Sequence, residues 1–195
     1  QAAVALARLL TLGQQVPADP AEAYVWYSVA LRLGRRDAED SRDDLVATMS
    51  TEQLAEARRR NAVRGDLDDQ YALGAAYAEG KGVKADLVEA VRWYRSAATN
   101  HHPEAQLKLG LALLEGRGVP RNDVEAASWL DQAARQSHRT AQWYLGNLFY
   151  EGRGVARDRS QAFNWYSRAA AAGLVAAQTQ VGVMLTQGVG TQTNV

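Results

Sequence analysis

A 36-residue repeat dominates this sequence and most constrains its fold. The segment Tyr71 to Asn100 reads YALGAAYAEGKGVKADLVEAVRWYRSAATN. It returns thirty-six residues later as LKLGLALLEGRGVPRNDVEAASWLDQAARQ, and thirty-six later again as WYLGNLFYEGRGVARDRSQAFNWYSRAAAA. A fixed register over more than half the chain identifies a tandem repeat, and a period of this length predicts a row of similar small units.

Each unit predicts two helices joined by a glycine loop. Tyr71 to Glu79 carries apolar or small residues at spacings of three and four, which is helical periodicity. The following EGKGVKAD contains two glycines, which tolerate positive φ and end helices. Asp86 with Glu89 forms a capping-box pattern that starts a second helix, as do Asn122 with Glu125 and Asp158 with Gln161. One such hairpin has too small a core to fold alone, so the units must stack.

Glycine recurs inside the first helix of each unit, at Gly74, Gly110, Gly146 and Gly182. Glycine within a helix costs about 1 kcal/mol relative to alanine. A cost that is repeated four times predicts a steric reason. We expect two helix backbones to approach closely there, with the tryptophan of the second helix (Trp93, Trp129 or Trp165) beside the glycine.

The repeat resembles the Sel-one-like repeat (SLR) family, a branch of the tetratricopeptide-like superfamily. The shared pattern is A-x-x-x-L-G-x-x-Y, then G-x-G-V, then D-x-x-x-A-x-x-W-Y-x-x-A-A. The matching residues of one unit are Leu73, Gly74, Tyr77, Gly80, Gly82, Val83, Asp86, Ala90, Trp93, Tyr94, Ala97 and Ala98. The resemblance implies an all-α fold, a right-handed α/α superhelix of paired helices that serves as a scaffold for binding other proteins or peptides.

The chain divides by register into one solenoid of six repeats. Residues 1–34 are a weaker copy, and residues 35–65 are a divergent copy that is five residues short and lacks the glycine loop. Residues 66–101, 102–137 and 138–173 are regular, and residues 174–195 are a partial sixth repeat with loop glycines Gly188 and Gly190. Because the sequence starts and stops inside a repeat, we expect it to be a fragment whose uncovered ends favour self-association.

Composition excludes several classes of function. The 22 basic and 22 acidic residues cancel, so no attraction to nucleic acid is expected. No apolar run approaches membrane-spanning length, so no direct membrane insertion is expected. The absence of cysteine excludes disulfides, thiol catalysis and cysteine-ligated zinc, and it fits the bacterial periplasm and the cytoplasm equally. Abundant alanine and arginine with little lysine are typical of a bacterial, high-GC source.

No catalytic, cofactor or metal site is predicted. The G-x-G pairs follow helices and recur in every unit, which favours turns over phosphate-binding loops. His101 and His102 have no further ligand nearby in sequence, so a solvated linker is favoured over a metal site. The basic run Arg58 to Arg60 lies beside acidic residues and predicts a solvated face. No nucleophile–base motif such as GxSxG, SxxK or HExxH is present.

Variable residues on the first helices predict the partner-binding surface. In tetratricopeptide-like architectures these helices line the concave side. The residues expected to contact a protein or peptide partner are Tyr71, Lys108, Trp143, Asn147 and Tyr150. The alternative for the apolar members is simple packing against the neighbouring hairpin. The predicted function is a non-catalytic scaffold or adaptor in bacterial signalling, polarity or envelope processes.

Two rival functions belong to other classes. Some bacterial proteins of similar sequence have been associated with β-lactam or peptidoglycan-fragment binding or hydrolysis, although this chain has no acylating Ser-Lys pair. A purely structural spacer, in which the repeats only set a distance, is the other alternative.

Overall fold

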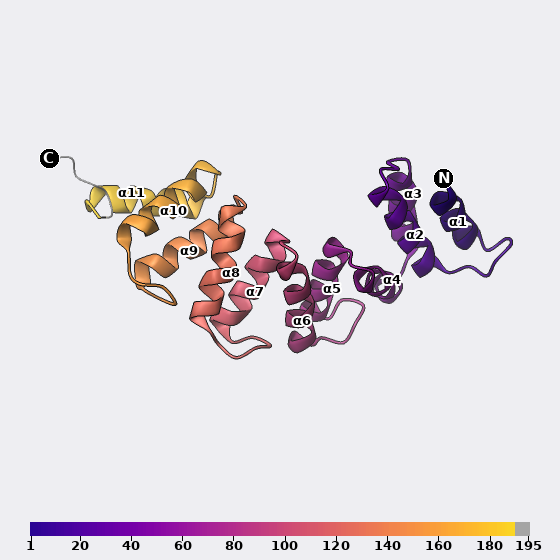
Figure 1. Cartoon of the computed structure of the whole chain (residues 1–195), viewed down its shortest axis with the longest axis horizontal. Helices are drawn as coiled ribbons and strands as arrows, with labels where there is room; N and C mark the ends of the chain where they lie inside the picture. Colours follow the sequence, from indigo (N-terminus) through magenta and orange to yellow (C-terminus); the bar gives the residue numbers. More distant parts are fainter. Residues whose placement is uncertain (190–195) are drawn as a thin grey trace. The chain divides into compact units, whose positions relative to one another are not determined.

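All regular structure in the described part of the chain, residues 1–189 of the computed structural model, is helical. The eleven helices there make five pairs and a final helix, which confirms the predicted all-α fold (Figure 1). They are α1 (Ala2–Leu12), α2 (Pro20–Arg32), α3 (Ala38–Thr48), α4 (Thr51–Val63), α5 (Leu67–Glu79), α6 (Leu87–Thr99), α7 (Pro103–Glu115), α8 (Asp123–Arg135), α9 (Arg139–Glu151), α10 (Arg159–Ala171) and α11 (Val175–Thr186).

The chain divides into two compact units at a point within α6, the first ending at Trp93 and the second starting at Tyr94. In the first unit α2 packs against α1, α3 and α4, and α4 packs against α5. In the second unit each helix from α7 to α11 packs against the next along the chain (Figure 1). The limits given above for the six repeats stay a prediction. Gly190 and the rest of the sixth repeat beyond residue 189 lie outside the described residues.

The helix boundaries follow the predicted capping residues. Helices α5, α7 and α9 each end at the first loop glycine, which has left-handed φ. Asp19 caps the helix that Pro20 opens. A complete capping box, with bonds in both directions, forms between Ser50 and Gln53. The caps of α6, α8 and α10 accept the amide of the third helical residue, at Asp86, Asn122 and Asp158.

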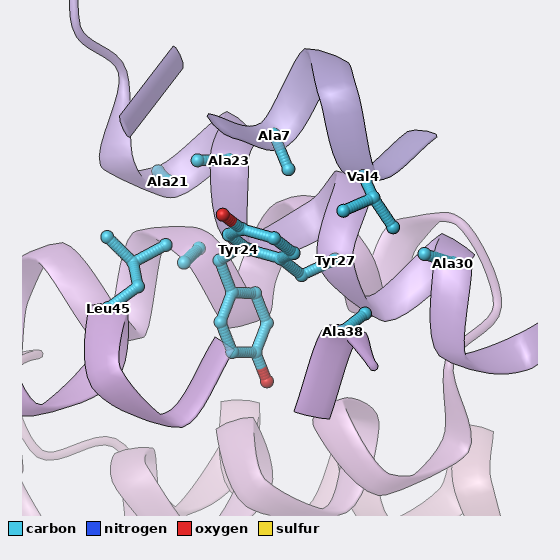
Figure 2. Close-up of a cluster of buried hydrophobic side chains, with 10 residues drawn as sticks. Val4, Ala7, Ala21, Ala23, Tyr24, Tyr27, Ala30, Ala38 and Leu45 are labelled. Atoms are coloured by element: carbon cyan, nitrogen blue, oxygen red, sulfur yellow. The ribbon is translucent and has the colours of Figure 1, made fainter. Parts of the chain in front are cut away.

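Small residues let the helices of a pair approach closely. In the first unit the buried cluster joins Val4 and Ala7 of α1 to Tyr24 and Tyr27 of α2 and to Leu45 of α3 (Figure 2). Buried alanines fill the space between these larger side chains. Each one contributes little area by itself, so the core depends on the close contact of several helices rather than on one large cluster.

A recurring glutamine bonds each hairpin to the previous one. The glutamine lies in the first helix of a hairpin and donates its Nε2 to a carbonyl in the last turn of the helix before it, at 3.0–3.3 Å. Each of these carbonyls also accepts the backbone amide three residues further on, so the glutamine adds a second hydrogen bond that ties the two hairpins together. The pairs are Gln70 with Ala62, Gln106 with Ala98, Gln142 with Ala134, and Gln178 with Ala170.

Gly110 and Gly146 are sites of close approach, but the predicted neighbour was wrong by one position, and a Cβ at Gly182 would meet nothing within 4 Å. A Cβ at Gly146 would lie 2.7 Å from the ring of Tyr166, and one at Gly110 would lie 2.8 Å from Cγ of Leu130. Each neighbour is the residue that follows the tryptophan. The glycine therefore receives the side chain that points into the hairpin.

The second loop glycine packs against the neighbouring hairpin. A Cβ at Gly154 would overlap the backbone carbonyl of Asp123, the first residue of α8, and one at Gly82 would overlap that of Thr51 in α4. Arg153 extends the same contact, because its Nε and Nη2 donate to the Asp123 carboxylate at 3.3 Å. Arg121 and Arg153 together hold the pKa of Asp123 well below its usual range. We call this contact between a loop and the preceding helix the loop–helix latch.

Replacing Gly154 by alanine should destabilise the second unit strongly. Any L-residue there bears the left-handed backbone cost of about 1–2 kcal/mol, and its Cβ must also displace the latch. Gly173 is the matched control, because it also has positive φ but has open space around its Cβ position. In urea unfolding, Gly154→Ala should lose at least about 1 kcal/mol more than Gly173→Ala. Equal losses would show that the latch does not contribute to stability.

Candidate partner-binding site

The five predicted partner residues lie on three helices. Tyr71 is on α5 in the first unit, Lys108 is on α7 in the second, and the other three are on α9. Each unit has its own groove next to these helices, and the two grooves are described separately.

The groove of the second unit lies between α7 and α9 and has a volume of about 190 Å³. Its apolar lining comes from Leu111, Leu114 and Leu148, and Tyr144 and Asn147 add polar groups. Glu115, Glu151 and Arg153 complete the lining near the helix ends and the loop. We call this set the α7–α9 groove. It combines apolar surface with groups that can hydrogen-bond, as sites for peptides do.

Asn147 is oriented by a buried tyrosine. The hydroxyl of Tyr166 donates to Oδ1 of Asn147 at 2.7 Å, and burial raises the pKa of that hydroxyl. Because its oxygen is held in this way, the amide of Asn147 is fixed and its NH₂ group is the end left for a ligand. A fixed amide loses little conformational entropy when it binds.

The two large aromatic residues predicted beside Asn147 pack toward the following helices instead. Trp143 and Tyr150 are both half-buried against the cluster that contains Tyr166 and Met184. Trp143 also contacts the ring of Tyr144 edge-on, with centroids 4.9 Å apart. Of the three predicted residues on α9, Asn147 lines the groove. Lys108 is exposed on α7 and is not among the residues that line it.

The first unit has a larger groove between α4 and α5, of about 350 Å³. Tyr71 lines it together with Leu54, Arg58, Ala72 and Ala75. In the 36-residue register, Ala72 and Ala75 occupy the positions of Tyr144 and Asn147. Smaller side chains at these two positions are consistent with the wider groove.

A buried polar network in the first unit was not predicted. Asp69 on α5 is 5% exposed, and its two carboxylate oxygens accept from the Tyr24 hydroxyl at 2.8 Å and from Asn61 Nδ2 at 2.7 Å. Arg58 Nε lies 3.8 Å from Asp69 and has no hydrogen-bond partner. Burial raises the pKa of the Asp69 carboxyl, and the bonds from Asn61 and Tyr24 offset part of that effect. Burial and the Asp69 charge raise the pKa of the Tyr24 hydroxyl.

The register of the repeat contains the signal that could have located this network. Asp69 occupies the position of Ala105, Ala141 and Ala177 in the later units. Asn61 likewise occupies the position that is alanine in the second helices of the other repeats, namely Ala30, Ala97, Ala133 and Ala169. All of these alanines are buried, so a polar side chain at either position must enter the core. Comparing the units for small-to-polar changes would have found both residues.

The linker histidines act as helix caps. Nδ1 of His102 accepts the amide of Ala105, and Nδ1 of His138 accepts the amide of Ala141. Over residues 1–189, no three histidine, cysteine or acidic side chains come together in a way that could hold a metal ion. The search of that same part of the chain for a helix with the length and apolarity of a bilayer span found none.

Antiparallel helix pairs that follow one another in a fixed register define a helical-hairpin repeat protein. A family model described as the Sel1 repeat matches residues 1–34, 68–102, 103–138 and 140–174, more than half of the chain. The chain therefore belongs to the Sel1 repeat family, as the resemblance predicted. Proteins of this family are in general protein-interaction scaffolds and are typically non-catalytic.

Solved structures with the same fold include three bacterial proteins. The c5321 protective antigen of uropathogenic Escherichia coli, described as having an SLR fold, is 29% identical with a TM-score of 0.76 over 99% of this chain. This chain spans only 42% of that protein's length. A Sel1 repeat protein of Oxalobacter formigenes is 38% identical, with a TM-score of 0.61 over 64% of this chain and 94% of the other. Helicobacter pylori cysteine rich protein B is 25% identical, with a TM-score of 0.52 over 66% of this chain and 96% of the other. A search of curated proteins found no match.

The buried carboxyl of Asp69 should give the first unit a characteristic pH dependence. Because its folded-state pKa is raised, the folded chain binds more protons than the unfolded chain between neutral pH and about pH 4. The carboxyl therefore contributes most to stability below its unfolded pKa, and that contribution is lost as the pH rises through its folded pKa.

The comparison of wild type with Asp69→Asn isolates this effect. As the pH falls from 7 toward 4, the unfolding free energy of the wild type should improve relative to that of the variant, measured by urea unfolding at each pH. Two parallel profiles would contradict the raised pKa.

Proposed function

We propose that this chain is a non-catalytic scaffold that binds an extended segment of a partner protein along the first helices of its hairpins. The observation that supports this most directly is the α7–α9 groove. Leu111 and Leu114 are partly exposed there beside the fixed amide of Asn147. Apolar side chains next to an oriented hydrogen-bonding group are what an extended peptide needs, since its side chains and its backbone must both be satisfied.

The size of the groove favours a side chain of a polypeptide over a whole small molecule. Its volume of about 190 Å³ is below the roughly 300–1,000 Å³ typical of small-molecule sites. One apolar side chain of the partner would occupy the surface formed by the leucines. The NH₂ group of Asn147 would then donate to a backbone carbonyl of the same segment.

The charges at the end of the groove favour a basic residue in the partner. The side chains of Glu115 and Glu151 are 53% and 51% exposed. Arg153 lies beside them, but its guanidinium also bonds the Asp123 carboxylate in the loop–helix latch. Glu115 pairs with Arg117 at 3.5 Å and Glu151 with Arg153 at 3.7 Å, but both carboxylates stay half-exposed. A lysine or arginine one or two residues from the apolar anchor would share them, an interaction that mainly sets register and specificity.

The remaining predicted residues have different parts in this proposal. Tyr71 lines the α4–α5 groove and would anchor a partner on the first unit. Lys108 is exposed and would contact a partner that extends beyond the α7–α9 groove. Trp143 and Tyr150 would act indirectly, because their packing against the α10–α11 cluster holds α9 in place.

The proposal is tested by selecting peptides from a random display library against the whole chain and measuring their affinity by titration calorimetry. Selected peptides should share an apolar residue close to a basic one. Asn147→Ala and Tyr144→Ala should each weaken binding by about tenfold, as expected for loss of a central polar or aromatic contact.

The matched control is Tyr166→Phe. This variant removes the hydrogen bond that the Tyr166 hydroxyl donates to Asn147, and it leaves the residues that line the groove unchanged. This variant should weaken binding by no more than about threefold, because the amide remains present but is less fixed. Selected peptides whose affinity is unchanged by Asn147→Ala and Tyr144→Ala would overturn the assignment of the groove.

A further inference from the structure

A second pocket of about 240 Å³ lies in the first unit, between α2, α3 and the start of α5. It is separate from the α4–α5 groove and is lined mainly by polar residues. Its lining residues are Tyr24, Ser28, Leu31, Arg32, Arg42, Asp66, Asp68 and Asp69. Two of these, Tyr24 and Asp69, belong to the buried polar network described above, and Figure 2 shows the Tyr24 hydroxyl pointing away from Val4 and Ala7.

The pocket contains a buried hydroxyl with no hydrogen-bond partner. Ser28 is only 5% exposed, and its Oγ makes no hydrogen bond in the protein. Leaving a buried polar atom without a partner costs roughly 1–3 kcal/mol. Ser28 lines the same pocket as the Asp69 carboxylate, so a ligand that satisfied the hydroxyl would also lie near a buried charge.

The charges around the pocket indicate the sign of that ligand. Arg32 donates to the carboxylate of Asp66 at 2.8 Å, and Arg42 donates to that of Asp43 at 3.1 Å. Both guanidiniums of the pocket are thus already engaged by carboxylates. The nearest cationic atom to Asp69 is Arg58 Nε at 3.8 Å, which is too far for a hydrogen bond. A cation beside Asp69 is therefore better matched to the pocket than an anion.

We infer that this pocket binds an aliphatic primary ammonium group. An ammonium has three donors, and the pocket offers three suitable acceptors in the Asp69 carboxylate, the Ser28 hydroxyl and the Tyr24 oxygen, which already donates to Asp69 and can still accept. Leu31 provides an apolar wall for the methylene stem. The same chemistry is present in a lysine side chain of a partner protein and in a free alkylamine.

The repeat register gives independent support for a specialised site. The later repeats have buried alanine at the positions of Asn61 and Asp69, so the repeat packs there without a buried charge. A buried carboxylate is a poor way to stabilise a helical hairpin compared with alanine. Its presence beside an unsatisfied hydroxyl is explained if a cation binds there.

The test uses the whole chain and three probes in ¹H–¹⁵N NMR titrations. The probes are n-butylammonium, N-acetyl-lysine-N-methylamide, and the same lysine amide acetylated on Nζ. The first two should shift the amide signals of Ser28 and Asp69 with a dissociation constant on the order of 1 mM, which is reasonable for so small a ligand. If both probes bind, the ammonium group and its methylene stem are sufficient for recognition. If only the lysine amide binds, the natural ligand is a lysine side chain of a partner protein. The acetylated probe should not bind.

Two variants make the test specific to this pocket. Ser28→Ala removes a hydroxyl that makes no bond in the free protein, so it should fold normally and weaken binding about tenfold. The double variant Asn61→Ala, Asp69→Ala restores the alanines of the regular units and should abolish binding. If the double variant does not fold, Ser28→Ala decides the question. No binding to the wild type, equal binding of the acetylated probe, or binding that is unchanged in Ser28→Ala would overturn the inference.

Discussion

Contact between neighbouring hairpins is the constraint on which this structure depends. One hairpin has only some alanines and a few larger side chains as its core, which is too little apolar surface to fold alone. The neighbour supplies the rest through two recurring devices. A glutamine donates a hydrogen bond to a carbonyl at the end of the preceding helix, and a loop glycine places backbone directly against the start of another helix. Both devices act between neighbouring hairpins, so the stability of a hairpin is tied to the one before it.

These devices leave the outer residues of the first helices free to vary. Gln142 and Gly146 face the helices with which α9 packs, whereas Tyr144 and Asn147 line the α7–α9 groove. The equivalent positions in the first unit carry Ala72 and Ala75, and the groove there has a different size and charge. A shared frame with variable groove residues allows one architecture to bind different partners, as expected for a family of interaction scaffolds.

The sequence predicts the fold well because the repeat presents every signal several times. Periodicity, the caps at Asp86 and Asn122, and the turn glycines agree in successive repeats, and so the helix boundaries follow.

The neighbour of the helical glycines was misplaced by one residue, because spacing along a helix does not show which side chain points inward. Tyr166 and not Trp165 contacts Gly146. The placement of Trp143 and Tyr150 could not be predicted either, since packing against α11 depends on tertiary contacts that the pattern of α9 does not contain. Asp69 was overlooked because a consensus shows what units share, while this network consists of what one unit changes.

The loop–helix latch has a consequence for how such chains change in evolution. At Gly154 the latch is a contact between two backbone segments of the same chain, and it depends little on which side chains surround it. A gene could therefore gain or lose a whole 36-residue module and still close the new junction, because each module carries both halves of the joint. Growth by whole modules thus needs no new interface to be invented, and natural selection can act on the length of the array independently of what its grooves bind.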